Sequence, residues 1–185
     1  MIRRLLAIVV ALAMPTACGT SPPAAPVKAS DKASDKASDK APAKAPDKAP
    51  AKASVLAFAG KTIDGQAFDA ATLAGKPALL WFWAPWCATC AGQASSVQEV
   101  QEEYAGKLGV LGIAGLGSNA EMHEFVNDLE IPDVRTLDDE TGEVWRKFGI
   151  TQQSTYVLID AGGTVVTSSY LDSVDLPAKV KTLVG

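Results

Sequence analysis

Residues 55–185 alternate hydrophobic and polar positions in a pattern that predicts both strands and helices. The run Ala78–Trp83 is continuously apolar and lies between prolines, which is typical of a central strand buried on both faces. Other strands are expected at 56–58, in a hairpin over 61–68 that turns at Asp64-Gly65, at 107–114, and in a hairpin of 155–160 and 164–169 that turns at Gly162-Gly163. Helices are expected over 88–104, from a capping box at Ser118 and Glu121, over 141–148 and over 174–183. This order predicts a mixed α/β sheet covered by helices.

Two segments of different character precede this domain. Residues 1–17 have a basic start and an apolar run too short to span a bilayer, which is the form of an export signal. Their end, Thr16-Ala17-Cys18-Gly19, resembles a bacterial lipoprotein signal, which implies that Cys18 is lipidated, although Pro15 stands where such signals usually carry leucine. Ordinary cleavage that frees the protein is the alternative.

Residues 18–54 are expected to form a disordered linker. From residue 29 to residue 52 they repeat in fours, first as Ala-Ser-Asp-Lys and then as Ala-Pro-Ala/Asp-Lys. This repeat contains no large apolar side chain whose burial offsets the entropy lost on ordering. We therefore interpret it as a spacer between a membrane and the domain.

Counting charge by segment changes the interpretation of the whole chain. The chain has a formal net charge of −4, but residues 55–185 alone contain 8 basic and 17 acidic residues, a net charge of −9. A domain this acidic has no basic patch to neutralise phosphates. Nucleic acid is therefore not expected as a partner.

Apart from Cys18, the chain has two cysteines, Cys87 and Cys90, which follow the predicted buried strand and begin a predicted helix. Unpaired N–H groups and the dipole at a helix start favour the thiolate of the first cysteine. Two intervening residues let the second sulfur reach back, so the first can attack a disulfide and the second can resolve the intermediate. A zinc site lacks ligands, since the domain otherwise offers only His123. An inert structural disulfide is the alternative, but it would add little stability across so short a loop and would not need the strand-to-helix position.

The sequence ALLWFWAPWCATC at 78–90 resembles the active-site strand and turn of the thioredoxin superfamily, and within it the exported TlpA/DsbE/DsbF-like thiol-disulfide oxidoreductases. Further matching segments follow in the family's order: Gly60–Gly65, Gly75-Lys76-Pro77, Phe148–Gln152 and Val157–Asp160. The resemblance implies a thioredoxin-like fold with an N-terminal hairpin extension, with Cys87 as nucleophile and Cys90 as resolving cysteine. No cofactor and no metal is expected.

Several residues depart from that family. Gln93 and Ser95 stand where relatives often have glutamate and proline, and Trp81 stands where thioredoxins have a buried acid. Ser154 stands in place of the family's cis-proline, so we predict a trans Gln153–Ser154 bond and a shifted loop opposite the cysteines. Trp86, Gln153 and Ser154 are the expected substrate-facing residues.

The remaining candidates are expected to be structural. His123 is assigned to the polar surface of a helix, Trp83 and Trp145 to the core, and Asp138-Asp139-Glu140 to the start of a helix rather than to a metal site.

These observations together predict an exported, membrane-tethered, monomeric thiol-disulfide oxidoreductase on the outer face of the cytoplasmic membrane, secreted instead if Cys18 is not lipidated. Its partners would be cysteine-containing exported proteins and a recycling redox protein, with oxidative folding favoured. The alternatives are a TlpA-like reductase, including one in cytochrome c maturation, and a non-catalytic binding module that retains a disulfide. A thiol peroxidase is disfavoured, because Ala84 lies where such enzymes place threonine or serine.

Overall fold

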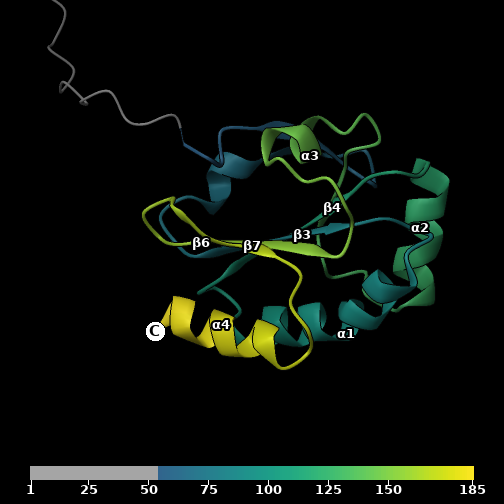
Figure 1. Cartoon of the computed structure of the whole chain (residues 1–185). Coiled ribbons are helices and arrows are strands. Elements are labelled where there is room, and N and C mark those ends of the chain that lie inside the picture. The colour runs from purple at the N-terminus through teal and green to yellow at the C-terminus, as the bar shows by residue number, and fades with distance from the viewer. Residues whose placement is uncertain (1–53) are drawn as a thin grey trace, which may run out of the picture. The chain divides into compact units, whose positions relative to one another are not determined.

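The computed structural model describes residues 54–185, and the strands of this part of the chain form one mixed sheet (Figure 1). The strands are β1 (Ala59–Thr62), β2 (Ala67–Asp69), β3 (Ala78–Trp83), β4 (Gly109–Ala114), β5 (Thr136–Asp138), β6 (Thr155–Ile159) and β7 (Val165–Ser169). Their spatial order is β2-β1-β5-β4-β3-β6-β7. Central β3 pairs in parallel with β4 and antiparallel with β6. The predicted thioredoxin-like architecture, with its N-terminal β1–β2 hairpin, is confirmed. The predicted signal and the linker up to residue 53 lie outside the described residues.

Helices cover both faces of this sheet. They are η1 (Ala70–Leu73, a 3-10 turn), α1 (Ala88–Glu103), α2 (Asn119–Asp128), α3 (Glu143–Lys147) and α4 (Asp175–Val184). In Figure 1, α1 and α4 lie on one side of the sheet and α3 on the other. Because side chains alternate along a strand, β3 sends Trp81 and Trp83 into the core beneath α1 and α4, and Leu80 and Phe82 into the core beneath α3. All six residues of β3 are buried, as its apolar run predicted.

Two segments of the sheet differ from the sequence-based expectation. The expected strand at 56–58 is a turn, in which the N–H of Ala57 donates to the carbonyl of Ser54, although Leu56 is buried in the core. The apolar pattern of residues 56–58 therefore reflects the burial of Leu56 rather than pairing with another strand. Strand β5 was not expected, since three residues are too short to show a period. It is held by β1 on one side and by β4 on the other.

The predicted capping interactions are present. Ser118 and Glu121 form the expected capping box at the start of α2. The carboxylate of buried Asp139 accepts hydrogen bonds from the N–H groups of Val144 and Trp145, at 3.1 and 2.9 Å, so the acidic turn stabilises the start of α3. Within residues 54–185, no helix combines the length and the apolar character needed to cross a membrane.

Candidate active site

Cys87 and Cys90 lie where β3 leads into α1. Cys87 is the N-cap of α1, with extended backbone (φ −91°, ψ 104°), and its Sγ accepts a hydrogen bond from the N–H of Cys90 at 3.0 Å. The first N–H groups of a helix have no partner inside the helix. In α1 the N–H of Cys90 is one of these groups, and the Cys87 sulfur accepts its hydrogen bond. This arrangement favours negative charge on Cys87 whenever the disulfide is reduced.

The two cysteines form a disulfide whose Cα atoms are 5.2 Å apart. This separation lies within the usual range for disulfides. Cys87 retains 5% exposure, whereas Cys90 has none. Cys87 is therefore the more accessible of the two cysteines to a sulfur of another protein, as its expected role of nucleophile requires.

Ser154, at the end of the loop that leads into β6, lies directly opposite the disulfide. Its Oγ is 3.2 Å from the Sγ of Cys87 and 3.2 Å from the Sγ of Cys90. The φ of Ser154 is +63°, in the left-handed region, whereas the ring of proline holds φ near −65°. The loop at Ser154 thus has a conformation that proline cannot adopt. The trans state of the Gln153–Ser154 bond stays a prediction.

Buried Gln93 ties this loop to the helix and the sheet. Its Oε1 accepts from the indole Nε1 of Trp81 at 3.0 Å, and its Nε2 donates to the carbonyls of Ser154 and Leu171, at 3.2 and 3.4 Å. The sequence marked Trp81 and Gln93 as two separate departures from the family. The structure shows that they are partners, and that the hydrogen bonds of Gln93 reach the residue opposite the cysteines.

Trp86 and Gln153 were also expected to face substrate. The side chain of Trp86 is 60% exposed, and its Nε1 donates to the carbonyl of Leu116 at 2.7 Å, which fixes the ring beside Cys87. Gln153 is half-buried next to Ser154. Cys18, the expected lipidation site, lies outside the described residues.

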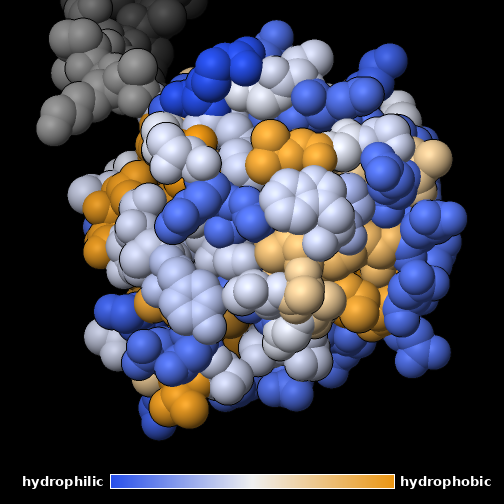
Figure 2. Space-filling view, turned by 45° about the vertical axis from the view of Figure 1, so that its right-hand side comes forward, coloured by the Kyte–Doolittle hydropathy of each residue, from blue (hydrophilic) through white to orange (hydrophobic). Residues whose placement is uncertain are grey.

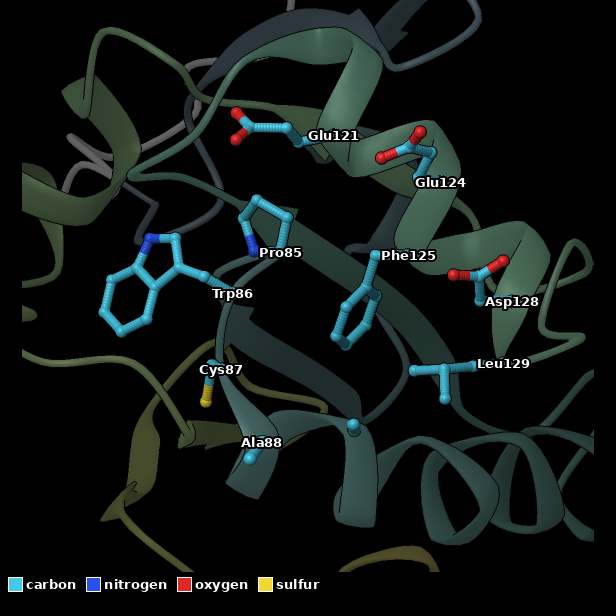
Figure 3. Close-up of a pocket in the computed structure, with 10 residues that line it drawn as sticks. Pro85, Trp86, Cys87, Ala88, Glu121, Glu124, Phe125, Asp128 and Leu129 are labelled. Carbon is cyan, nitrogen blue, oxygen red and sulfur yellow. The ribbon is translucent and has the colours of Figure 1, made fainter. Parts of the chain in front are cut away.

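A groove of about 420 Å³ opens beside Cys87, between the start of α1 and helix α2 (Figure 3). Its floor and wall are apolar, and its rim on α2 is acidic; the lining residues are Pro85, Trp86, Cys87, Ala88, Ala91, Glu121, Glu124, Phe125, Asp128 and Leu129. In Figure 2, hydrophobic side chains gather near the middle of one face of the domain, with hydrophilic ones along their border. Hydrogen bonds from the backbone and side chain of Ser118 lower the pKa of Glu121, which keeps its carboxylate charged.

The other candidate residues lie away from the cysteines or in the core. Trp83 and Trp145 are buried in the core. The ring of His123 is partly exposed, 3.0 Å from the carbonyl of Ile63, on the far side of α2 from the cysteines' groove. In the described part of the chain, no three His, Cys, Asp or Glu side chains gather as a metal site would require. The buried carboxylate of Asp139 accepts a hydrogen bond from the N–H of Val144 at the start of α3.

A comparison with known families matches residues 36–183 to the model described as Redoxin. Among curated proteins, the soluble secreted antigen MPT53 of Mycobacterium tuberculosis is 34% identical over 109 residues, which cover 59% of this chain. The matched segment spans 62% of the length of MPT53.

Two solved structures are similar over most of their own length. A structure described as MTB dsbF, in mixed oxidised and reduced forms, is 40% identical, covers 70% of this chain and 96% of its own, and has a TM-score of 0.66. A secreted Mycobacterium tuberculosis disulfide oxidoreductase, described as homologous to E. coli DsbE, is 31% identical over 70% of this chain and 98% of its own, with a TM-score of 0.64.

Proposed function

This chain belongs to the Redoxin family, and from that premise we propose that it is a thiol-disulfide oxidoreductase that exchanges disulfides with cysteines of exported proteins. The observation that carries the proposal is the Cys87–Cys90 disulfide at the start of α1, in which Cys87 keeps slight exposure and Cys90 keeps none. The two similar structures of the DsbF and DsbE type support it.

In this proposal Cys87 is the exchanging cysteine and Cys90 the resolving one. A client, meaning the protein whose cysteines are exchanged, attacks Cys87 because Cys90 is inaccessible. A mixed disulfide between Cys87 and the client results, and Cys90 carries the electron pair of the broken bond. Attack by a second client thiolate on the client sulfur then releases a client disulfide and the reduced pair.

We favour oxidation of clients over their reduction. The reason is the proposed export, which brings the protein to compartments where structural disulfides form. The test is to mix the oxidised protein with a reduced, unfolded ribonuclease, and separately the reduced protein with insulin. Recovery of ribonuclease activity supports the oxidase, and efficient insulin precipitation alone favours the reductase. Failure of both assays would instead identify a non-catalytic binding module.

The groove beside Cys87 is the proposed binding site for the client segment that flanks its cysteine. Its apolar wall suits a hydrophobic side chain, and the exposed ring of Trp86 extends that wall. Among residues 54–185, three carboxylates line it and no Lys or Arg does, so charge complementarity favours a basic side chain in the client. Figure 3 shows these carboxylates projecting from α2, opposite Trp86 and Cys87.

A charge-reversal variant tests this binding preference. Glu124→Lys combined with Asp128→Lys is expected to lower kcat/KM for a lysine-bearing cysteine peptide by roughly tenfold, and to raise it for a glutamate-bearing one. Glu102→Lys with Glu103→Lys, at the other end of α1, is the matched control, because it makes the same change of net charge away from the groove. Equal effects of both double variants on both peptides would contradict groove recognition.

We further propose that the protein is exported and held at the outer face of the cytoplasmic membrane through a lipid on Cys18. The expected result is that the wild-type protein partitions with membranes and is released by detergent. Cys18→Ala is expected to be soluble, because it lacks the sulfur that would carry the lipid. Cell fractionation followed by immunoblotting measures this, and wild-type protein found wholly in the medium would reject the anchor in favour of secretion.

A further inference from the structure

We propose that the Ser154 hydroxyl is a catalytic hydrogen-bond donor that serves both sulfurs of the pair, an inference that rests on the exchange function proposed above. In each exchange step a sulfur departs with an electron pair, and a donor placed beside that sulfur stabilises the charge as it develops. Ser154 Oγ is placed to do this for Cys90 in the first step and for Cys87 in the second.

The first support is the position of the oxygen. Ser154 Oγ is 3.2 Å from each sulfur, and Ser154 is only 7% exposed. The Sγ of Cys87 has a second donor in the N–H of Cys90. The Sγ of Cys90, by contrast, has no other hydrogen-bond partner among residues 54–185. A buried Cys90 thiolate would therefore depend on Ser154 for stabilisation, because an unpaired charge away from water is costly.

The second support is how the hydroxyl is held in place. The carbonyl of Ser154 accepts from Gln93 Nε2 at 3.2 Å, and Gln93 is itself fixed by the indole of Trp81. The left-handed φ of Ser154 is a conformation that non-glycine residues rarely adopt, so the surrounding contacts must maintain it. Gln93 is thus a positioning residue for Ser154, and Ser154 is the residue that touches the reacting atoms.

The chemistry balances without any further reactant. A client thiolate attacks Cys87 Sγ, the Cys87–Cys90 bond breaks, and the electron pair leaves on Cys90, where the Ser154 O–H donates to it. A second client thiolate attacks the client sulfur of the mixed disulfide, and the electron pair leaves on Cys87, to which the same O–H can turn. The client loses two electrons and the cysteine pair gains them.

Removing the hydroxyl should therefore affect both the rate and the redox equilibrium. A hydrogen bond to a charged group has a net effect that corresponds to roughly a 10- to 100-fold change, so Ser154→Ala is expected to slow disulfide transfer by about that factor. Because the thiolate accepts more strongly than the disulfide does, the loss destabilises the reduced state. We expect the equilibrium constant for reduction by glutathione to fall about tenfold, a potential about 30 mV more negative.

Three companion variants separate the hydroxyl from the backbone. Ser154→Gly also removes the hydroxyl but relaxes the positive φ, whereas Ser154→Ala keeps that strain. Ser154→Thr retains a hydroxyl, but its β-branched side chain disfavours the left-handed φ, so it should recover only part of the potential. Ser95→Ala, on the exposed side of α1, is the control for losing a serine hydroxyl near the pair in sequence.

Two measurements test whether the Ser154 hydroxyl stabilises the thiolates. One is the thiolate absorbance of the reduced protein during a pH titration, and the other is the equilibrium with glutathione. The proposal expects thiolate formation about one pH unit higher in both Ser154→Ala and Ser154→Gly, with Ser95→Ala unchanged. An unchanged titration and potential in both deletion variants would overturn it. Neither the thiolate titration nor the glutathione equilibrium involves a client. A wild-type protein that transfers no disulfide to clients would therefore reject the exchange function, but it would not change the outcome of these two measurements.

Discussion

Cys87→Ser is expected to abolish disulfide transfer to below one part in about a thousand of the wild-type rate, because covalent exchange begins at that sulfur. When Cys90→Ser is mixed with a disulfide-containing client, the Cys87 thiolate is expected to attack one client sulfur and the other client sulfur leaves as a thiolate; the mixed disulfide then persists, since the resolving thiol is missing. Gel electrophoresis without reductant should therefore show mixed disulfides in Cys90→Ser and none in Cys87→Ser.

The two single variants control for one another, because each removes one sulfur from the same turn. The opposite trapping pattern, with adducts forming through Cys90, would contradict the roles drawn from exposure. So would equal alkylation of both reduced cysteines at mildly acidic pH, where the N-cap position of Cys87 should make its sulfur react first.

Gln93→Leu is expected to cost about 3 kcal/mol of unfolding free energy. Leucine fills the space but leaves three buried polar groups without their partner: the Trp81 indole and the carbonyls of Ser154 and Leu171. Each such group costs about 1–3 kcal/mol, and partial relaxation reduces the sum. Urea denaturation with tryptophan fluorescence measures the change.

Gln98→Leu is the matched control for that substitution. It lies on the same helix and replaces a side chain that, within the described part of the chain, hydrogen-bonds only to Glu102 at the surface, so a change below about 0.5 kcal/mol is expected. If Gln93→Leu were as mild as this control, the network would be incidental to stability. The position of Ser154 would then need another support.

Local signals in the sequence predicted most of the fold. Six consecutive apolar residues between prolines marked β3 as central, and the capping box marked the start of α2, because both features are complete within a few residues. Strand β5 has no such signal. It forms because it pairs with β1 on one side and β4 on the other, and both partner strands lie far from it in the sequence.

The same distinction holds at the site. The spacing and context of Cys87 and Cys90 are local, so the redox pair was predictable. The Gln93–Ser154 hydrogen bond joins residues 61 positions apart, and neither residue type by itself indicates the contact. The groove likewise needs α1 and α2 side by side, which no local pattern specifies.

The structure brings the departures from the family together beside the disulfide. Trp81 stands where thioredoxins have a buried acid and Gln93 where relatives often have glutamate, and Gln93 Oε1 accepts a hydrogen bond from the Trp81 indole. The hydrogen-bonding capacity left over on Gln93 reaches the loop where proline has been replaced by Ser154. The result is a network of uncharged, hydrogen-bonded side chains beside the disulfide, with a hydroxyl at the sulfurs.

Direct disulfide transfer tests the central claim most simply. The oxidised protein is mixed with an equimolar reduced peptide that carries two cysteines, the reaction is quenched with acid, and both masses are measured over time. We expect the peptide to lose two hydrogens as the Cys87–Cys90 pair gains them, with a transient adduct that maps to Cys87. A peptide that stays reduced while the protein's disulfide stays intact would contradict it.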